Sequence, residues 1–396
     1  DSMRKYVAAY PDDIEGWNLL GETQFHTRQL TGLTPKELVE PFDRVLALDS
    51  TLTPSAIHPL EVTLLAGDSV GFFKYLTLYR RSASLSEADA YAAAGTLVWG
   101  HASPDSAAAA SLQQHMGATS AALMEAQSGP EASGIRAVER FENAIGAVVV
   151  TQPGDQNRFQ MAMGRGLLLS SVGRFNETAQ IADSLSKINS QQAGVLYLGP
   201  AILGIAPDSY GKSFLEGFER IPINNPFVAY FRAAILLSRG DAQRAGHILD
   251  SAVRDTLKFP EFMRGAYQGA LGWRALMVGD TTTGIRLLRT GAERLGGNSF
   301  FSAPLRLQLG AALAARPDTR DQGLKLLHYG FVNDLGAEPV AYFALGRAAE
   351  AAGRKDEALF GYGQFVRLWD RPDSAAAGRV KEAKEALARL TGEPKP

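Results

Sequence analysis

The segment 206–213 has the residue types of a phosphate-binding loop. It reads APDSYGKS and ends in the Gly-Lys-Ser with which such loops hold phosphate, although alanine stands at the usual place of the first glycine. A loop of this kind needs a strand before it, a helix after it and a parallel sheet around it. Residues 196–205 continue a helical apolar pattern instead. We therefore predict that Gly211 serves packing within the second helix of a hairpin, and a nucleotide-binding enzyme acting through Gly211-Lys212-Ser213 stays the alternative from another functional class.

The histidines and serines offer little further chemistry. No histidine lies three or four residues from another, and His58 with Glu61 is the one adjacent pair of metal-binding type. Two ligands do not complete a metal site, so solvated or partly buried helix histidines are expected. Ser184 and Lys187 have the spacing of a serine–lysine nucleophile but lack its companion motifs. The absence of cysteine excludes disulfides, cysteine–zinc sites and thiol catalysis. We predict no catalytic residue, no cofactor and no metal.

Length and charge exclude further classes of protein. The 40 basic and 42 acidic side chains are interspersed and give a net charge of −2, so no basic stripe for nucleic acid is present. The sequence contains no run of 18 apolar residues, so no membrane span is predicted. Residues 1–6 are polar and lack a signal core. We interpret the chain as the C-terminal part of something longer or as a processed product, whose compartment depends on what precedes Asp1.

A small residue inside an apolar helical stretch recurs along the chain. The six sites are Arg165-Gly166, Leu198-Gly199, Arg232-Ala233, Leu271-Gly272, Leu309-Gly310 and Leu345-Gly346. Successive small residues are 33, 34, 39, 38 and 36 positions apart. This period indicates helical hairpins that cannot bury their own apolar faces and must stack. We predict an all-α solenoid, a right-handed superhelix of about nine or ten hairpins with a C-terminal capping helix.

Turn-forming residues divide the apolar stretches into helix pairs. The breakers are Gly67-Asp68, Gly173-Arg174, Gly240-Asp241, Gly279-Asp280, Arg316-Pro317-Asp318 and Gly353-Arg354. We predict partly degenerate hairpins over 1–150, a helical repeat array over 151–370, and a cap and tail over 371–396, with the cap helix at 373–390. No repeat register can be assigned to residues 84–150 from the sequence. Residues 148–150 are expected to end a helix rather than form a strand.

The repeat pattern resembles the tetratricopeptide repeat. Residues 339–370 read aromatic-x2-Leu-Gly, then glycine, then Ala-x3-aromatic, and residues 17–21 repeat the first part as Trp-x2-Leu-Gly. The segments Tyr10-Pro-Asp-Asp13 and Phe365–Asp370 add to this pattern. With them, the chain resembles the tetratricopeptide region attached to some bacterial serine/threonine protein kinases. None of the kinase catalytic motifs occurs, so no kinase activity is expected in these residues.

The resemblance implies a concave groove lined by the first helix of each hairpin. Counting from each small residue, the groove residues are Phe227, Tyr230, Trp273, Phe343, Arg347 and Glu350, with Asn18 and Glu22 in the first hairpin. Aromatic and arginine side chains are frequent anchors of interfaces. Aromatic side chains also dominate protein cores, and arginine also forms surface ion pairs. The expected function is a non-catalytic protein- or peptide-binding scaffold, a sensor or regulatory region of a bacterial signalling protein. The alternative among binding proteins is the ligand-sensing region of a transcription regulator.

Overall fold

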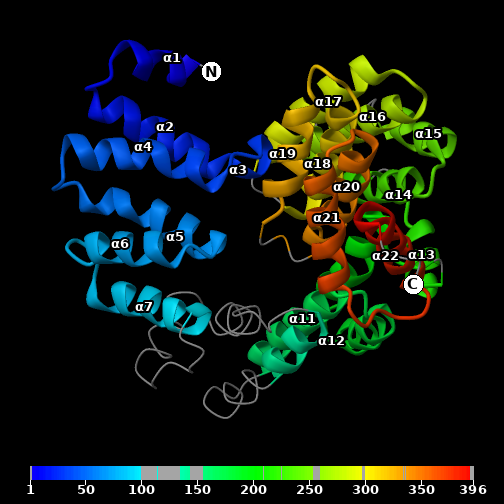
Figure 1. Cartoon of the computed structure of the whole chain (residues 1–396). Coiled ribbons are helices and arrows are strands. Elements are labelled where there is room, and N and C mark those ends of the chain that lie inside the picture. The colour runs from blue at the N-terminus through cyan, green and yellow to red at the C-terminus, as the bar shows by residue number, and fades with distance from the viewer. Residues whose placement is uncertain are drawn as a thin grey trace. The chain divides into compact units, whose positions relative to one another are not determined.

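In the computed structural model of the chain, the regular secondary structure of the described residues is all helical (Figure 1). These are residues 2–99, 114, 134–142, 155–207, 209–223, 225–252, 259–296, 299–332, 334 and 336–392. No strand occurs among them. The chain divides into two compact units, Asp1–Gly164 and Arg165–Pro396.

The first unit begins with two helical hairpins. Its helices are α1 (Ser2–Ala9), α2 (Ile14–His26), α3 (Arg28–Thr31), α4 (Pro35–Leu48), η1 (Thr53–Ala56), α5 (Ile57–Ala66), α6 (Ser69–Tyr79) and α7 (Leu85–Trp99). Helix α2 pairs with α4, and α5 pairs with α6. The short helix α3 lies in the loop of the first hairpin and ends at the left-handed Gly32.

Local sequence signals explain where these helices begin. Asp13 caps α2 by accepting hydrogen bonds from the backbone of Glu15 and Gly16. Thr34 and Glu37 form a reciprocal capping box at the start of α4. Within the first hairpin, a Cβ on Gly21 would lie 2.8 Å from the Phe42 ring. The small residue therefore lets α2 and α4 approach, as the repeat pattern predicts.

The second unit contains the regular array. Its helices are α11 (Asp155–Ser171), which carries the boundary between the units, α12 (Phe175–Ile202), α13 (Lys212–Glu219), α14 (Pro226–Ser238), α15 (Ala242–Ala252), α16 (Glu261–Met277), α17 (Thr281–Leu295), α18 (Ser299–Ala314), α19 (Arg320–Tyr329), α20 (Glu338–Ala351), α21 (Lys355–Leu368) and α22 (Ala377–Thr391). The predicted breakers separate consecutive helices of this unit. The prediction of an all-α stack of helical hairpins is confirmed.

Helix α12 contains two helices of the array. Asn189 has non-helical φ and ψ of −148° and 94° and kinks it in the middle. The first half places Thr178 and Ile181 against Gly166 of α11, and the second half opens the next hairpin, where it meets α13. Asn189 also accepts a hydrogen bond from the backbone of Gln192 at 3.1 Å, which starts the second half.

Glycine allows α16 and α17 to pack backbone against backbone. A Cβ on Gly291 would lie 2.6 Å from the backbone nitrogen of Gly269, and one on Gly272 would lie 2.7 Å from the nitrogen of Leu288. In each facing pair the two residue numbers add up to 560, as is expected for two antiparallel helices. Gly346 likewise faces the Tyr362 ring of α21, at 2.7 Å from its would-be Cβ. Gly199 departs from this pattern, because it faces Phe300 of α18 rather than a helix of its own hairpin.

The last hairpin of the second unit packs against the first hairpin of the same unit. The fully buried Trp369, just after α21, donates its indole N–H to the backbone oxygen of Ser171 at 2.9 Å. The backbone of Asp373 donates to Gly173 at 3.0 Å, and its carboxylate accepts from the backbone of Asn176 at 2.6 Å. Asp373 therefore caps α12 from 197 residues away in sequence. The capping helix α22 begins at Ala377, four residues after the predicted start, because Asp373 makes these contacts instead.

Candidate partner site

The structure places the first two predicted groove residues against the chain's own Phe301. Tyr230 of α14 is fully buried, and its hydroxyl donates to the backbone oxygen of Phe301 at 2.9 Å. The Phe301 ring also lies 6.0 Å from that of Phe227, centroid to centroid, and 5.8 Å from that of Phe262. Phe227 keeps 41% of its surface exposed. The N-terminal end of α18 thus occupies the inner side of α14.

The other predicted aromatic residues are also in the core. Trp273 of α16 belongs to the same apolar cluster as Tyr230 and Phe301 and is 4% exposed. Phe343 of α20 packs within its own hairpin, with its ring centroid 4.9 Å from that of Phe365. Their role in binding a partner stays a prediction, and their observed role is packing.

The two charged groove residues lie beside the C-terminal helix. Glu350 of α20 accepts hydrogen bonds from Tyr362 at 2.8 Å and from Arg389 of α22 at 2.9 Å. Arg347 lies 3.7 Å from Glu382 of α22 and keeps 65% of its side chain exposed. Both ion pairs are at the surface, where such pairs contribute about 0–1 kcal/mol. Arg347 and Phe227 are therefore the predicted groove residues that remain most accessible.

The phosphate-loop segment has no strand before it. Helix α12 precedes it, and Gly211 is the N-terminal cap of α13 with a left-handed φ of 61°. The prediction that Gly211 lies within a helix is wrong, because it precedes the helix. Its packing role is present nonetheless, since a Cβ there would lie 2.5 Å from the Tyr197 ring. Lys212 is exposed and lies 3.9 Å from Glu216 on the same helix.

An apolar cavity of 480 Å³ lies in the second unit. Its walls come from α11, the second half of α12, the start of α18 and the segment with Asp334, Gly336 and Ala337, and they include Leu167, Val195, Leu203 and Phe300. Asp334 is the charged group among the lining residues. The volume is within the range of cavities that hold one small ligand, and the lining suits an apolar group.

Asp334 is held by a buried arginine. Arg306 of α18 has no exposed surface and donates to the carboxylate of Asp334 at 2.9 Å. It also donates to Ser302 at 3.2 Å and to the backbone oxygen of Gly330, and its guanidinium lies 4.5 Å from the centroid of the Phe331 ring. Burial lowers the pKa of Arg306, and the charge of Asp334 opposes that shift. The pair anchors the wall of the cavity with its charges matched.

Sequence reasoning missed this cavity and its wall. Counting from the small residues assigned one face of each first helix, but Phe300, Phe301 and Arg306 lie at other positions of α18. Nothing in the local sequence Ser302-x3-Arg306 distinguishes a buried arginine from an exposed one. The apolar run at 299–305, interrupted only by serine and proline, was the available sign that α18 is buried on several sides.

Comparisons with known proteins show similarity to solved structures alone. No protein-family model and no curated protein matches the sequence. Among solved structures, the chain is similar to the crystal structure of the P58(IPK) TPR domain, with 11% sequence identity over 95% of this chain and 99% of that one and a TM-score of 0.25. The fold assignment rests on the helix pairing described above rather than on this similarity. Among the described helices, none is both long and apolar enough to cross a membrane.

Proposed function

We propose that the chain is a non-catalytic scaffold that binds a protein or peptide. The observation that carries this proposal is the apolar cavity of the second unit, into which a partner inserts an apolar side chain beside Asp334. Stacked helical hairpins are a common framework for such binding. The placement in a bacterial signalling protein, as its sensor or regulatory region, is supported by the sequence resemblance alone.

The cavity can be filled without disturbing the fold. Gly336 lines it, and a Cβ built there has Leu203 as its nearest neighbour, at 3.9 Å. The backbone at Gly336 does not have a positive φ, so a larger residue is not strained there. Gly336→Leu therefore puts a side chain into the space that a partner would use. Gly217 of α13 is exposed with nothing within 4 Å of its Cβ position, and Gly217→Leu is the matched control.

The test begins with a displayed library of random peptides selected on the full chain. The affinity of a selected peptide is then measured by calorimetry for the parent chain and both variants. We expect Gly336→Leu to weaken binding by about 2 kcal/mol or more, as loss of an interface anchor does, and Gly217→Leu to leave it unchanged. A failed selection, or peptides that bind the Gly336→Leu chain as tightly as the parent, would contradict the proposal.

The same cavity supports a second candidate function, the sensing of a small apolar ligand by a transcription regulator. Its volume of 480 Å³ suits a molecule of that size. A panel of small apolar compounds would then raise the melting temperature of the parent chain and of Gly217→Leu but not of Gly336→Leu. A peptide that binds the cavity while no small compound does would decide for the scaffold.

A further inference from the structure

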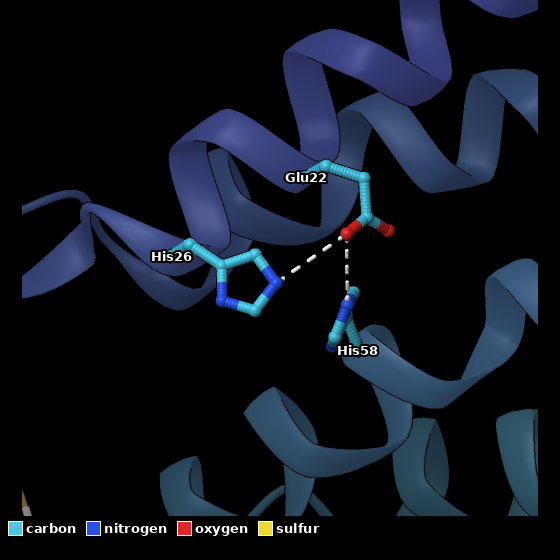
Figure 2. Close-up of side chains that lie close together, drawn as sticks. All are labelled: Glu22, His26 and His58. Atoms are coloured by element: carbon cyan, nitrogen blue, oxygen red, sulfur yellow. Dashed lines mark hydrogen bonds and ion pairs between the residues drawn. The ribbon is translucent and has the colours of Figure 1, made fainter. Parts of the chain in front are cut away.

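We infer that Glu22, His26 and His58 form a binding site for a divalent transition-metal ion of the zinc type. The three residues belong to the first unit, so the inference is independent of the cavity proposed above. Figure 2 shows both imidazole rings directing a nitrogen toward the carboxylate of Glu22. One ligand atom from each residue lies within 4.8 Å of the other two.

The spacing of these atoms fits a tetrahedral ion. The Nε2 atom of His26 lies 3.4 Å from Oε2 of Glu22, and Nε2 of His58 lies 3.3 Å from the same oxygen. Zinc binds nitrogen and oxygen at 2.0–2.2 Å, so two of its tetrahedral ligands lie about 3.3–3.6 Å apart. Both carboxylate–imidazole distances therefore already have the separation that a shared ion requires.

The repeat brings the three side chains together. Glu22 and His26 are four residues apart on α2 and share one face of that helix. His58 follows Glu22 by 36 residues, one repeat period, and lies on α5, the first helix of the next hairpin. Equivalent faces of successive first helices are neighbours in a stack of hairpins. Glu22 and His26 are thus a second pair of metal-binding type beside His58 and Glu61, contrary to the expectation of one such pair.

A second layer of side chains fixes His58. Its Nδ1 atom lies 3.2 Å from Oε2 of Glu61, and Tyr91 donates to the other oxygen of Glu61 at 2.9 Å. The Phe25 ring stacks on the imidazole with 3.9 Å between centroids. A carboxylate on the far nitrogen of a histidine is the usual support of a metal ligand, because it orients the ring and makes the other nitrogen a better donor.

With Nδ1 supported by Glu61, the other nitrogen of His58, Nε2, needs a positively charged group between it and Glu22. When Nδ1 of His58 donates its proton to Glu61, Nε2 presents a lone pair to the negative oxygen of Glu22, 3.3 Å away. Two acceptors at that distance require either a second proton on the ring or a metal ion between them. The convergence of His26 on the same oxygen favours the metal ion, which takes both nitrogens and the carboxylate as ligands.

The ligand set limits which ion binds and how. Two neutral imidazoles and one carboxylate suit zinc, cobalt, nickel or copper rather than magnesium or calcium, which prefer oxygen. His26 exposes 64% of its side chain and Glu22 exposes 37%. The fourth position of the ion therefore faces solvent and takes a water molecule, while the three protein ligands tie α2 to α5.

The test measures binding of Zn²⁺ alone to the full chain after dialysis against a chelator. Calorimetry of the parent chain should show one equivalent bound, and Co²⁺ should give the intense visible absorption of a four-coordinate ion. His26→Ala and Glu22→Gln should each weaken Zn²⁺ binding by at least about tenfold, the lower limit of what loss of a supporting residue costs. His247→Ala, which removes an exposed histidine of α15, is the matched control and should leave binding unchanged.

Three results would overturn the inference. Absence of Zn²⁺ binding by the parent would mean that the second proton on His58, not a metal, satisfies the cluster. Equal binding by the parent and His26→Ala, or an equal loss in His247→Ala, would place the ion elsewhere. Circular dichroism of each variant shows that it is folded, and His26 is exposed enough that its removal leaves no cavity.

Discussion

The pair formed by Arg306 and Asp334 is the most deeply buried charge interaction among the described residues. Replacing Asp334 with alanine leaves the guanidinium of Arg306 buried without this carboxylate. We expect a loss of about 3–5 kcal/mol in the free energy of unfolding, measured by chemical denaturation. Asp321→Ala is the control, because its pair with Arg354 is 2.9 Å long but 81% exposed on the aspartate side. A similar small cost for both variants would show that Arg306 is solvated.

His328 makes stability depend on pH. Its imidazole stacks on Tyr329 and Phe360, with centroids 4.0 and 4.4 Å away, and burial lowers its pKa from the usual value while Glu357 opposes the shift. The unfolded chain therefore binds a proton at a higher pH than the folded chain. Stability contributed by neutral His328 is complete above the unfolded pKa of about 6.5 and is lost as the pH falls through that value toward the folded pKa.

The corresponding variant is His328→Gln, which cannot be protonated. Between about pH 7.5 and about pH 5.5, a range that spans the histidine pKa, we expect the parent to lose more stability than the variant. Denaturant midpoints measured along this range give the comparison, and the other histidines cancel because both proteins contain them. Parallel curves for the two proteins would show that His328 titrates normally.

At the scale of helices, the same substitution has opposite effects at two glycines. Alanine at Gly291 of α17 puts a Cβ 2.6 Å from the backbone of Gly269, so α16 and α17 must separate, at a cost of about 1–3 kcal/mol. Alanine at Gly217 of α13 meets nothing within 4 Å and gains helix propensity of about 0.8–1.0 kcal/mol. Thermal unfolding of both variants measures the difference. A stabilised Gly291→Ala chain would mean that the backbones are not in contact.

The sequence predicted the helices better than the surfaces between them. Glycines such as Gly240 and Gly279 ended helices as expected, since their positive φ suits the turn of a hairpin. The boundary between the two helices within α12 has no such signal, because neither glycine nor proline marks the kink at Asn189. The groove residues were assigned by helix face alone, and Tyr230 was buried by Phe301, 71 residues later in sequence. Contacts at such separations have no local signal.

At the scale of the second unit, Trp369 joins the last hairpin to the first. Its ring is fully buried and lies 5.9 Å from Phe175 and 4.9 Å from Phe365, centroid to centroid. Trp369→Ala should lower the free energy of unfolding by about 3–5 kcal/mol, the usual cost of removing a large buried ring. Trp369→Phe keeps most of the packing and loses the hydrogen bond to Ser171, so its cost should be smaller. Equal unfolding midpoints for the parent and the alanine variant would show that the junction is not stabilising.

The long-range cap made by Asp373 bears on how the second unit opens and folds. In an open array each repeat contacts its neighbours only, so terminal repeats fray first and hydrogen exchange is fastest at the ends. Here the backbone of Asn176 is held by a carboxylate 197 residues away, and neither terminal hairpin is a free end. Amides of the first and last hairpins should therefore exchange together. The same junction requires a long loop to close late in folding, which slows refolding relative to an open array of equal length.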